Sequence, residues 1–354
     1  MPQRVCHSKT TQWAAEGYSA AHCFCCAATC LPGTACEWYD KAMRRGRTKT
    51  LKKGGAHMPE KHAWTRWFWG VMGACALVQL VLAGATAGYA ADYNTFWAWA
   101  LRVAEEGFSG FYAEGYFADY PPGGILLLWP LGKLAQLLHI SHASAFARCL
   151  LAAPGILAGV GLAALCYRLA GPGRARGFVL GVAAGASPAL LYVTGVWKQM
   201  DMVYLLFLVA CFAALGKRRL FAAALCWGAA LALKPQSLIL GPVLAVCVLA
   251  DAWYSPKRLA ALGRAAGAGA AALVPALVCG LPFFGVSGLL PGLFEKYFST
   301  AQSYPYASLS AANWFSLLGA NWAPQTDRLL FFTYAQWGTL HIAVLTAACM
   351  NGIC

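Results

Sequence analysis

The chain has 354 residues, of which 60% are hydrophobic and only 11% are charged, and its mean hydropathy is +0.55. Soluble domains are about half apolar and about a quarter charged, so this composition excludes an ordinary soluble protein and predicts a polytopic membrane protein. The formal net charge of +14 does not indicate nucleic-acid binding, because the basic residues precede the first apolar run or lie mostly in short loops, as the positive-inside rule describes.

Residues 1–66 are a basic, cysteine-rich leader, which we expect to be cytoplasmic and disordered. Nine of the 27 Lys and Arg residues fall between Lys41 and Arg66, and six of the 15 cysteines fall within the first 36 residues. A single Cys-x-x-Cys step, without a second pair at zinc-finger spacing, does not predict a metal site. A second interpretation places the true start at Met58, which would leave residues 1–57 outside the protein.

Residues 67–354 are predicted to be a multi-pass, all-α helical membrane bundle. The segment 121–140 is apolar but is interrupted by Pro130 and Lys133. The positive-inside rule puts the N-terminus in the cytoplasm, and it puts the later basic loops there only if 121–140 does not cross the membrane. We therefore predict about eight spans, a re-entrant or incomplete segment at 121–140, and outward loops at 91–123 and 286–328. The uncharged runs are 67–90, 149–167, 177–197, 202–216, 220–233, 235–250, 265–294 and 329–354.

The first outward loop carries two carboxylates about 27 residues apart, Asp92 and Asp119. Asp92 follows the first span directly. The next stretch has Phe96, Trp97 and Ala100 on one side and Arg102, Glu105 and Glu106 on the other, which predicts a short helix lying in the membrane interface. The loop ends in Asp119-Tyr120-Pro121-Pro122-Gly123. Because the two prolines force extended backbone, we expect Asp119 and Tyr120 to be held in a fixed turn at the membrane surface.

Two further motifs place charges between apolar runs. In Lys198-Gln199-Met200-Asp201, the charges have a functional role or form an exposed turn with a loose Lys198–Asp201 pair; both interpretations stay open. Lys234-Pro235-Gln236 interrupts an otherwise continuous apolar run. Lys234 must therefore snorkel to the interface or meet an anion such as a lipid phosphate.

The second outward loop contains a block rich in aromatic, hydroxyl and amide side chains, from Tyr304 to Gly319. Aromatic residues at an interface normally anchor the protein in the bilayer. The density of polar groups beside Tyr304, Asn313 and Trp314 also suits stacking and hydrogen bonding to a sugar. Motifs for nucleotide binding, serine hydrolases and zinc proteases are missing from the sequence.

The order of these motifs resembles the GT-C superfamily of multi-pass glycosyltransferases, which use polyprenyl-phosphate sugars. The resemblance spans Trp67 to about Trp322 and is greatest to prokaryotic mannosyltransferase-like members. It comprises the outward Asp92, the Asp-Tyr-Pro-Pro-Gly turn, the Lys-Gln-Met-Asp turn, the Leu-Lys-Pro-Gln break and the late Tyr-Pro-Tyr block. Members of the superfamily tend to carry further spans after the position where this chain ends, which predicts a C-terminal truncation.

The resemblance implies an inverting hexosyltransferase, with mannose as the expected sugar and a lipid or glycan hydroxyl as the acceptor. Asp92 would be the general base. Lys234 and Lys198 would stabilise the leaving phosphate, and Asp119 would orient the loop, bind sugar hydroxyls or help to hold Mg²⁺ or Mn²⁺. The expected substrate-binding residues are Asp119, Tyr120, Lys198, Asp201, Lys234, Gln236, Tyr304, Asn313 and Trp314. The first loop has a single Asp where the superfamily has a pair, so the need for a divalent cation stays open.

The expected location is the bacterial plasma membrane, with the active site facing outward and a polyprenyl-phosphate sugar as donor. A membrane transporter or lipid flippase is the alternative, because interrupted helices and intramembrane charges occur in both classes. Related halves, which many transporters have, are not evident in this sequence. A scaffold without chemistry would not need Asp92, Asp119, Asp201 and Lys234 on one face.

Overall fold

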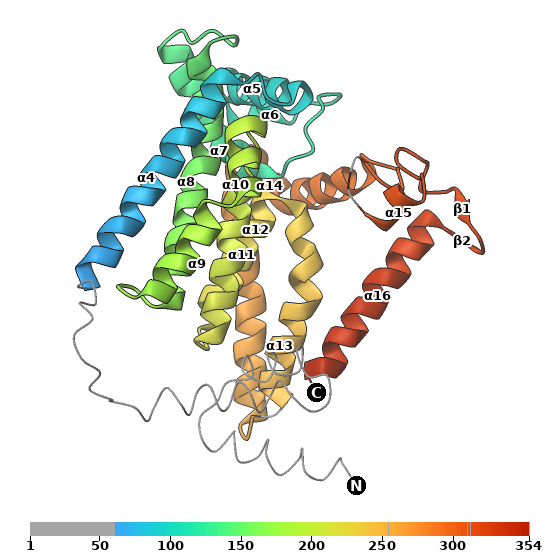
Figure 1. The fold of residues 1–354 in the computed structure, drawn as a ribbon. Helices are drawn as coiled ribbons and strands as arrows, with labels where there is room; N and C mark the ends of the chain where they lie inside the picture. The colour runs from blue at the N-terminus through green and yellow to red at the C-terminus, as the bar shows by residue number, and fades with distance from the viewer. Residues whose placement is uncertain (1–60, 254, 310, 312, 354) are drawn as a thin grey trace, which may run out of the picture.

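The computed structural model of the protein describes residues 61–353 apart from 254, 310 and 312, so the leader lies outside the described residues. Within this part the chain is a helical bundle with one two-residue antiparallel strand pair (Figure 1). The elements are α4 (Lys61–Ala85), α5 (Ala90–Glu105), α6 (Gly107–Phe111), α7 (Pro122–Leu137), α8 (Ala145–Ala170), α9 (Ala175–Gly185), α10 (Pro188–Leu191), η1 (Tyr192–Trp197), α11 (Asp201–Gly216), α12 (Leu220–Leu233), η2 (Pro235–Leu240), α13 (Gly241–Trp253), α14 (Arg258–Gln302), α15 (Trp314–Leu317), β1 (Arg328–Leu329), β2 (Phe332–Thr333) and α16 (Tyr334–Ile353).

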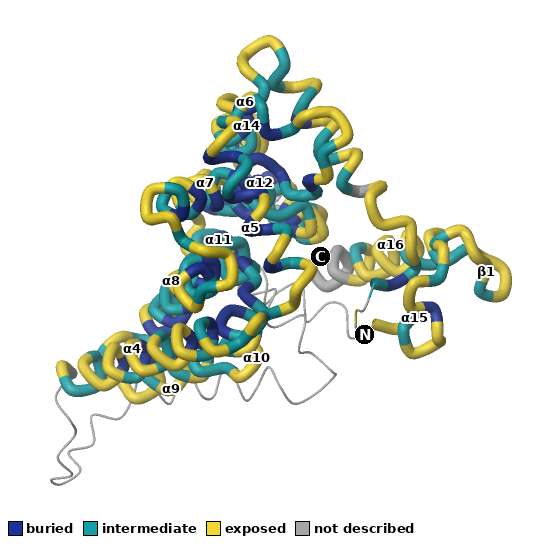
Figure 2. Tube along the Cα trace, turned by 90° about the horizontal axis from the view of Figure 1, so that it is seen from above, coloured by how far each residue is buried: buried dark blue, intermediate teal, exposed yellow. Residues whose placement is uncertain are grey.

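Four described helical segments are long and apolar enough to cross a membrane, namely His62–Ala85, Ala145–Ala170, Ala175–Trp197 and Arg258–Thr300. Three shorter apolar helical segments are Asp201–Gly216, Leu220–Leu233 and Pro235–Leu249. The structure therefore confirms a mostly helical chain with several potential spans, whereas the predicted count of about eight is not confirmed. The buried residues gather along the inner faces of the bundle, and the outer face of α4 is largely exposed (Figure 2).

The helix predicted after Asp92 is α5, and it lies across one end of the bundle (Figure 1). Phe96, Trp97 and Ala100 are buried, whereas Glu105 and Glu106 are exposed, as the amphipathic pattern predicts. The buried face belongs to the largest hydrophobic cluster, which α5 shares with α7. The burial of several aromatic rings fixes this helix to the bundle, at about 1.5–3 kcal/mol for each large apolar side chain.

The segment 121–140 forms α7, which begins and ends at the same end of the bundle. Pro122 starts the helix beside the last turn of α12, because Gly123 lies close to the carbonyl of Ala232. The loop after α7 then returns to the start of α5, where the Tyr93 hydroxyl donates a hydrogen bond of 2.6 Å to the His142 carbonyl. This course is compatible with a re-entrant or incomplete segment, which stays a prediction.

The uncharged run 265–294, predicted as one span, lies within the 45-residue α14, which bends sharply at Gly285. Gly285 has φ 64° and ψ −178°, a conformation that only glycine adopts readily. The segment 286–302 leaves the bundle axis and runs across the end that carries α5 (Figure 1). Apolar composition alone does not reveal this bend, although a proline three residues earlier, Pro282, is consistent with it.

Candidate functional site

Several residues singled out from the sequence gather at one end of the bundle, although they come from four separate segments. We call Asp92, Asp119, Tyr120, Asp201 and Lys234 the polar cluster. Asp92 lies in the first turn of α5, Asp201 begins α11, and Lys234 follows α12. Asp119 and Tyr120 immediately precede Pro121 and α7.

The Asp92 carboxylate is held by two side chains of the 197–201 turn. The Trp197 indole donates a hydrogen bond of 2.6 Å to Asp92 Oδ2, and the Gln199 amide donates a second one to the same oxygen. Within the described part of the chain no donor contacts Oδ1 of Asp92, so this oxygen can face a ligand. Sequence reasoning missed both partners of Asp92, although they flank Lys198 in a motif that it had identified.

The 197–201 turn is held in place by Lys198, whose side chain is only 1% exposed. Its ammonium donates hydrogen bonds to the carbonyl of Thr86 (2.9 Å), the hydroxyl of Thr86 (3.1 Å) and the carbonyl of Val196 (2.9 Å). The expectation of an exposed turn with a loose Lys198–Asp201 pair is therefore wrong. Lys198 points into the protein and joins the ends of α4 and η1, and its predicted contact with a donor phosphate stays a prediction.

Asp201 forms an ion pair with Lys234 instead. Lys234 Nζ also lies 5.5 Å from the centre of the Tyr120 ring and 5.6 Å from that of Tyr204, distances at which a cation is attracted to an aromatic face. The sequence left two alternatives for Lys234, snorkelling to the interface or contact with an anion. The structure supports the second, with Asp201 as the anion.

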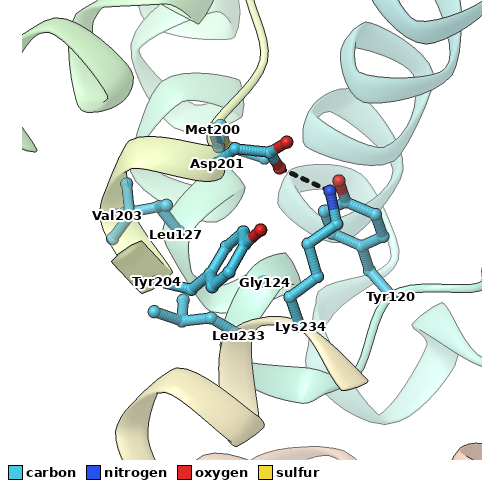
Figure 3. A pocket seen from close by; sticks show the side chains of 9 residues that line it. All are labelled: Tyr120, Gly124, Leu127, Met200, Asp201, Val203, Tyr204, Leu233 and Lys234. Carbon is cyan, nitrogen blue, oxygen red and sulfur yellow. Dashed lines mark hydrogen bonds and ion pairs between the residues drawn. The ribbon is translucent and has the colours of Figure 1, made fainter. Parts of the chain in front are cut away.

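The Asp201–Lys234 pair borders a small open pocket with a cavity volume of about 10 Å³ (Figure 3). Its lining residues are Tyr120, Gly124, Leu127, Met200, Asp201, Val203, Tyr204, Leu233 and Lys234.

The Asp119–Tyr120 turn is fixed from several sides, as the Pro-Pro motif predicts. Asp119 Oδ2 accepts a hydrogen bond of 2.5 Å from the Tyr304 hydroxyl, and the Asp119 carbonyl accepts one of 3.0 Å from Thr300. Tyr112 donates to the Tyr120 carbonyl at 2.8 Å. A Cβ on Gly124 would lie 2.8 Å from the Tyr120 ring, so this glycine, which follows the motif directly, allows the ring to pack against α7.

The Tyr120 side chain lies within electrostatic reach of all three aspartates of the polar cluster. Burial, followed by the charges of Asp201, Asp119 and Asp92, raises the pKa of Tyr120 well above its usual value. Burial and the hydrogen bond to Asp119 likewise raise the pKa of Tyr304. Both phenols therefore stay protonated at physiological pH and act as hydrogen-bond donors.

Three other predicted site residues have no recorded contact with the polar cluster in the described part of the chain. Gln236 is exposed in η2. Asn313 caps α15, because its side-chain oxygen accepts a hydrogen bond of 3.0 Å from the Ser316 amide. Trp314 is 61% exposed in the same short helix. Of the late aromatic block, Tyr304 contacts the polar cluster directly through Asp119.

No group of three or more His, Cys, Asp or Glu side chains among the described residues is arranged to hold a metal ion. The need for a divalent cation stays open, and we assign no step to one. No protein-family model matches the sequence, and no curated protein matches it either.

Proposed function

We propose that this protein is an integral-membrane glycosyltransferase that moves a hexose, with mannose expected from the resemblance, from a polyprenyl-phosphate donor to an acceptor hydroxyl on the non-cytoplasmic face. The observation that carries the proposal is the Asp92 carboxylate. One of its oxygens is fixed by Trp197 and Gln199, and the other is open at the end of the bundle that holds Lys234.

Asp92 acts as the general base. The acceptor oxygen attacks the anomeric carbon while its proton passes to Asp92 Oδ1, and the bond between the anomeric carbon and the phosphate oxygen breaks. The electron pair of that bond leaves with the polyprenyl phosphate. Attack from the side opposite the phosphate inverts the anomeric carbon. The hydrogen bonds from Trp197 and Gln199 orient the carboxylate, so little reorganisation is needed in the transition state.

Lys234 and Tyr120 receive the phosphate in the pocket. Lys234 makes one hydrogen bond in the described part of the chain, to Asp201, which leaves two N–H groups for phosphate oxygens. The protonated Tyr120 hydroxyl adds a neutral donor on the same side. These donors stabilise the charge that develops on the leaving oxygen, while Asp201 holds the ammonium in position.

The first test is transfer of labelled mannose or glucose from its polyprenyl-phosphate donor in membranes that contain the protein. Asp92→Asn keeps the shape of the side chain and removes the base, so we expect transfer to fall by at least about 10²-fold while the protein remains inserted. Asp327→Asn, in the exposed loop before β1, is the matched control and should behave like the parent. Parent-like turnover by Asp92→Asn would exclude Asp92 as the base.

A second test addresses the phosphate. Lys234→Ala leaves Asp201 without its partner, so the informative variant is the double substitution Lys234→Met/Asp201→Asn, which removes both charges. Loss of the cation should weaken donor binding by about tenfold or more, since hydrogen bonds to charged groups contribute about 1.5–3 kcal/mol. Donor affinity equal to that of the parent in this double variant would remove Lys234 from the phosphate site.

The alternative is a transporter or lipid flippase. The broken helices beside the polar cluster favour it, because η1 ends next to Lys198 and η2 begins next to Lys234. The same labelled donor distinguishes the two functions. A transferase yields a new labelled product, whereas a flippase moves unchanged donor between the two leaflets.

A further inference from the structure

The Trp197 indole, which holds the Asp92 carboxylate, packs with the rings of two tyrosines outside the Lys234 pocket. The ring of Trp197, which donates to Asp92, lies 5.6 Å from the ring of Tyr89 and 6.2 Å from that of Tyr192. Tyr89 is 56% exposed and Tyr192 is 54% exposed. None of the three residues lines the pocket that contains Lys234.

The local backbone explains why these rings meet. Lys198 ties Thr86, at the end of α4, to Val196 in η1. Gly88 follows Thr86 with φ +83°, and a Cβ there would lie 3.1 Å from Lys198 Nζ. The chain can therefore turn tightly over the Lys198 side chain, which places Tyr89 beside Trp197 and Asp92 one turn further along α5.

The π-helical turn η1 supplies the other two rings. Its wider turn spans Tyr192–Trp197, and such turns are frequent at functional sites. Tyr192 and Trp197 stand at its two ends, and their rings pack edge to face at an interplanar angle of 86°. A regular α-helix would place residues five apart on different faces.

We propose that Tyr89, Tyr192 and Trp197 form the binding subsite for a pyranose ring of the acceptor. The inference rests on the proposed function, because a general base must contact the acceptor hydroxyl. Asp92 accepts hydrogen bonds from Trp197 and Gln199 through Oδ2, which leaves Oδ1 for the acceptor hydroxyl. With the donor phosphate in the pocket, the acceptor approaches Asp92 from the aromatic side.

The chemistry of the three rings suits a sugar. A pyranose presents apolar C–H faces, which pack on aromatic rings, and a rim of hydroxyls, which need polar partners. Within the described residues the hydroxyls of Tyr89 and Tyr192 make no recorded hydrogen bond, so they can bind that rim. Residues that only anchor a protein in the membrane interface need no contact with a carboxylate, whereas here the central indole holds Asp92.

The test uses octyl mannoside and octyl glucoside as acceptor probes with the purified protein in lipid nanodiscs. Tyr89→Ala and Tyr192→Ala should each raise the KM for the acceptor by about tenfold, which corresponds to the loss of one aromatic contact, with kcat and the KM for the donor within about twofold of the parent. Phe146→Ala, at a 54% exposed aromatic residue in the first turn of α8, is the matched control and should leave the acceptor KM unchanged. An unchanged acceptor KM in both tyrosine variants would overturn the inference.

A binding measurement separates this inference from the proposed reaction. Saturation-transfer NMR should detect octyl mannoside or octyl glucoside bound to the parent and to Phe146→Ala, and a much weaker signal with Tyr89→Ala/Tyr192→Ala. If this difference appears but no sugar is transferred, the subsite stands and the transferase proposal fails. If the parent binds neither glycoside better than the double variant does, the subsite is excluded whether or not transfer occurs.

Discussion

Lys198 is a buried cation whose recorded hydrogen bonds, in the described part of the chain, go to neutral groups rather than to a carboxylate. The carbonyls that it contacts belong to Thr86, just after α4, and to Val196, near the end of η1. Unsatisfied carbonyls at helix C-termini carry partial negative charge, which a cation stabilises. One side chain thus caps two helices and joins the segment that leads to Asp92 to the segment that holds it.

The titration of Lys198 gives a first prediction about stability. Burial, followed by the charge of Arg148, lowers the pKa of Lys198 from 10.5 to about 8. Between these pH values the folded protein has released a proton that the unfolded chain still binds, so the free energy of unfolding rises with pH. We expect a rise of at most about 3 kcal/mol from this group.

Thermal unfolding of the parent, Lys198→Met and Lys217→Met at several pH values gives the slope of the free energy of unfolding against pH for each protein. Lys217 is exposed, so its variant should keep the slope of the parent, whereas Lys198→Met should lose it. Lys198→Met should also be less stable at every pH, because the carbonyls of Thr86 and Val196 lose their partner. Identical slopes for parent and Lys198→Met would show that Lys198 titrates as an ordinary surface lysine.

The sequence predicted which charged residues belong to the site, but it did not predict their partners. Charges that interrupt apolar runs identified Asp92, Asp119, Asp201 and Lys234, and the structure brings all four to one end of the bundle. Their partners were not predictable. Lys198 is the cation nearest to Asp201 in the sequence, and yet Asp201 pairs with Lys234, 33 residues away. Which ion pair forms is decided by the packing of α11 on α12, and a sequence pattern does not contain that information.

At the scale of elements, close helix contacts depend on glycines. A Cβ on Gly132 in α7 would lie 1.8 Å from the carbonyl oxygen of Ala100 in α5. The Gly132→Ala substitution must therefore push the two helices apart and loosen the buried aromatic cluster between them. Overpacking of this kind costs about 1–3 kcal/mol and sometimes more.

Thermal unfolding in detergent tests this prediction against Gly269→Ala. Gly269 lies in α14 with nothing within 4 Å of the added methyl group, so the control should gain about 0.5–1 kcal/mol from its better helix propensity. Gly132→Ala should be destabilised and should also lose activity, since α5 carries Asp92. Equal stability of the two variants would mean that α5 and α7 are not packed as closely as the structure shows.

Element boundaries were predictable where composition changes and not where the backbone alone changes. The amphipathic pattern predicted α5 and its buried face, and Lys234-Pro235 marked the junction of α12 and η2. The run 177–197 contains no charge, and yet the chain breaks after Gly185 and forms the π-helical turn η1 before Trp197. Neither that turn nor the bend at Gly285 alters hydropathy, so an apolar run gives no sign of them.

At the scale of the whole molecule, the course of α7 decides how the loops are arranged. If α7 crossed the membrane, the loop 138–144 would lie on the opposite side from the loop 112–121. The structure instead returns the 138–144 loop to α5 through the contact between Tyr93 and His142. The basic loop Lys217–Arg219 lies at the far end of α11 from Asp201, and the positive-inside rule predicts that this end is cytoplasmic.

Single cysteines in a variant without native cysteines test this arrangement, with a membrane-impermeant maleimide applied to right-side-out vesicles. The exposed positions Glu114, Ser141 and Thr326 should all be labelled in intact vesicles. Lys217→Cys should be labelled only after the vesicles are opened, because the positive-inside rule predicts that its loop is cytoplasmic. If Ser141→Cys behaved like Lys217→Cys while Glu114→Cys stayed accessible, α7 would be a full span. The later helices would then change sides, and the membrane would separate Asp92 from Asp201 and Lys234. That result would exclude both the polar cluster and the proposed reaction.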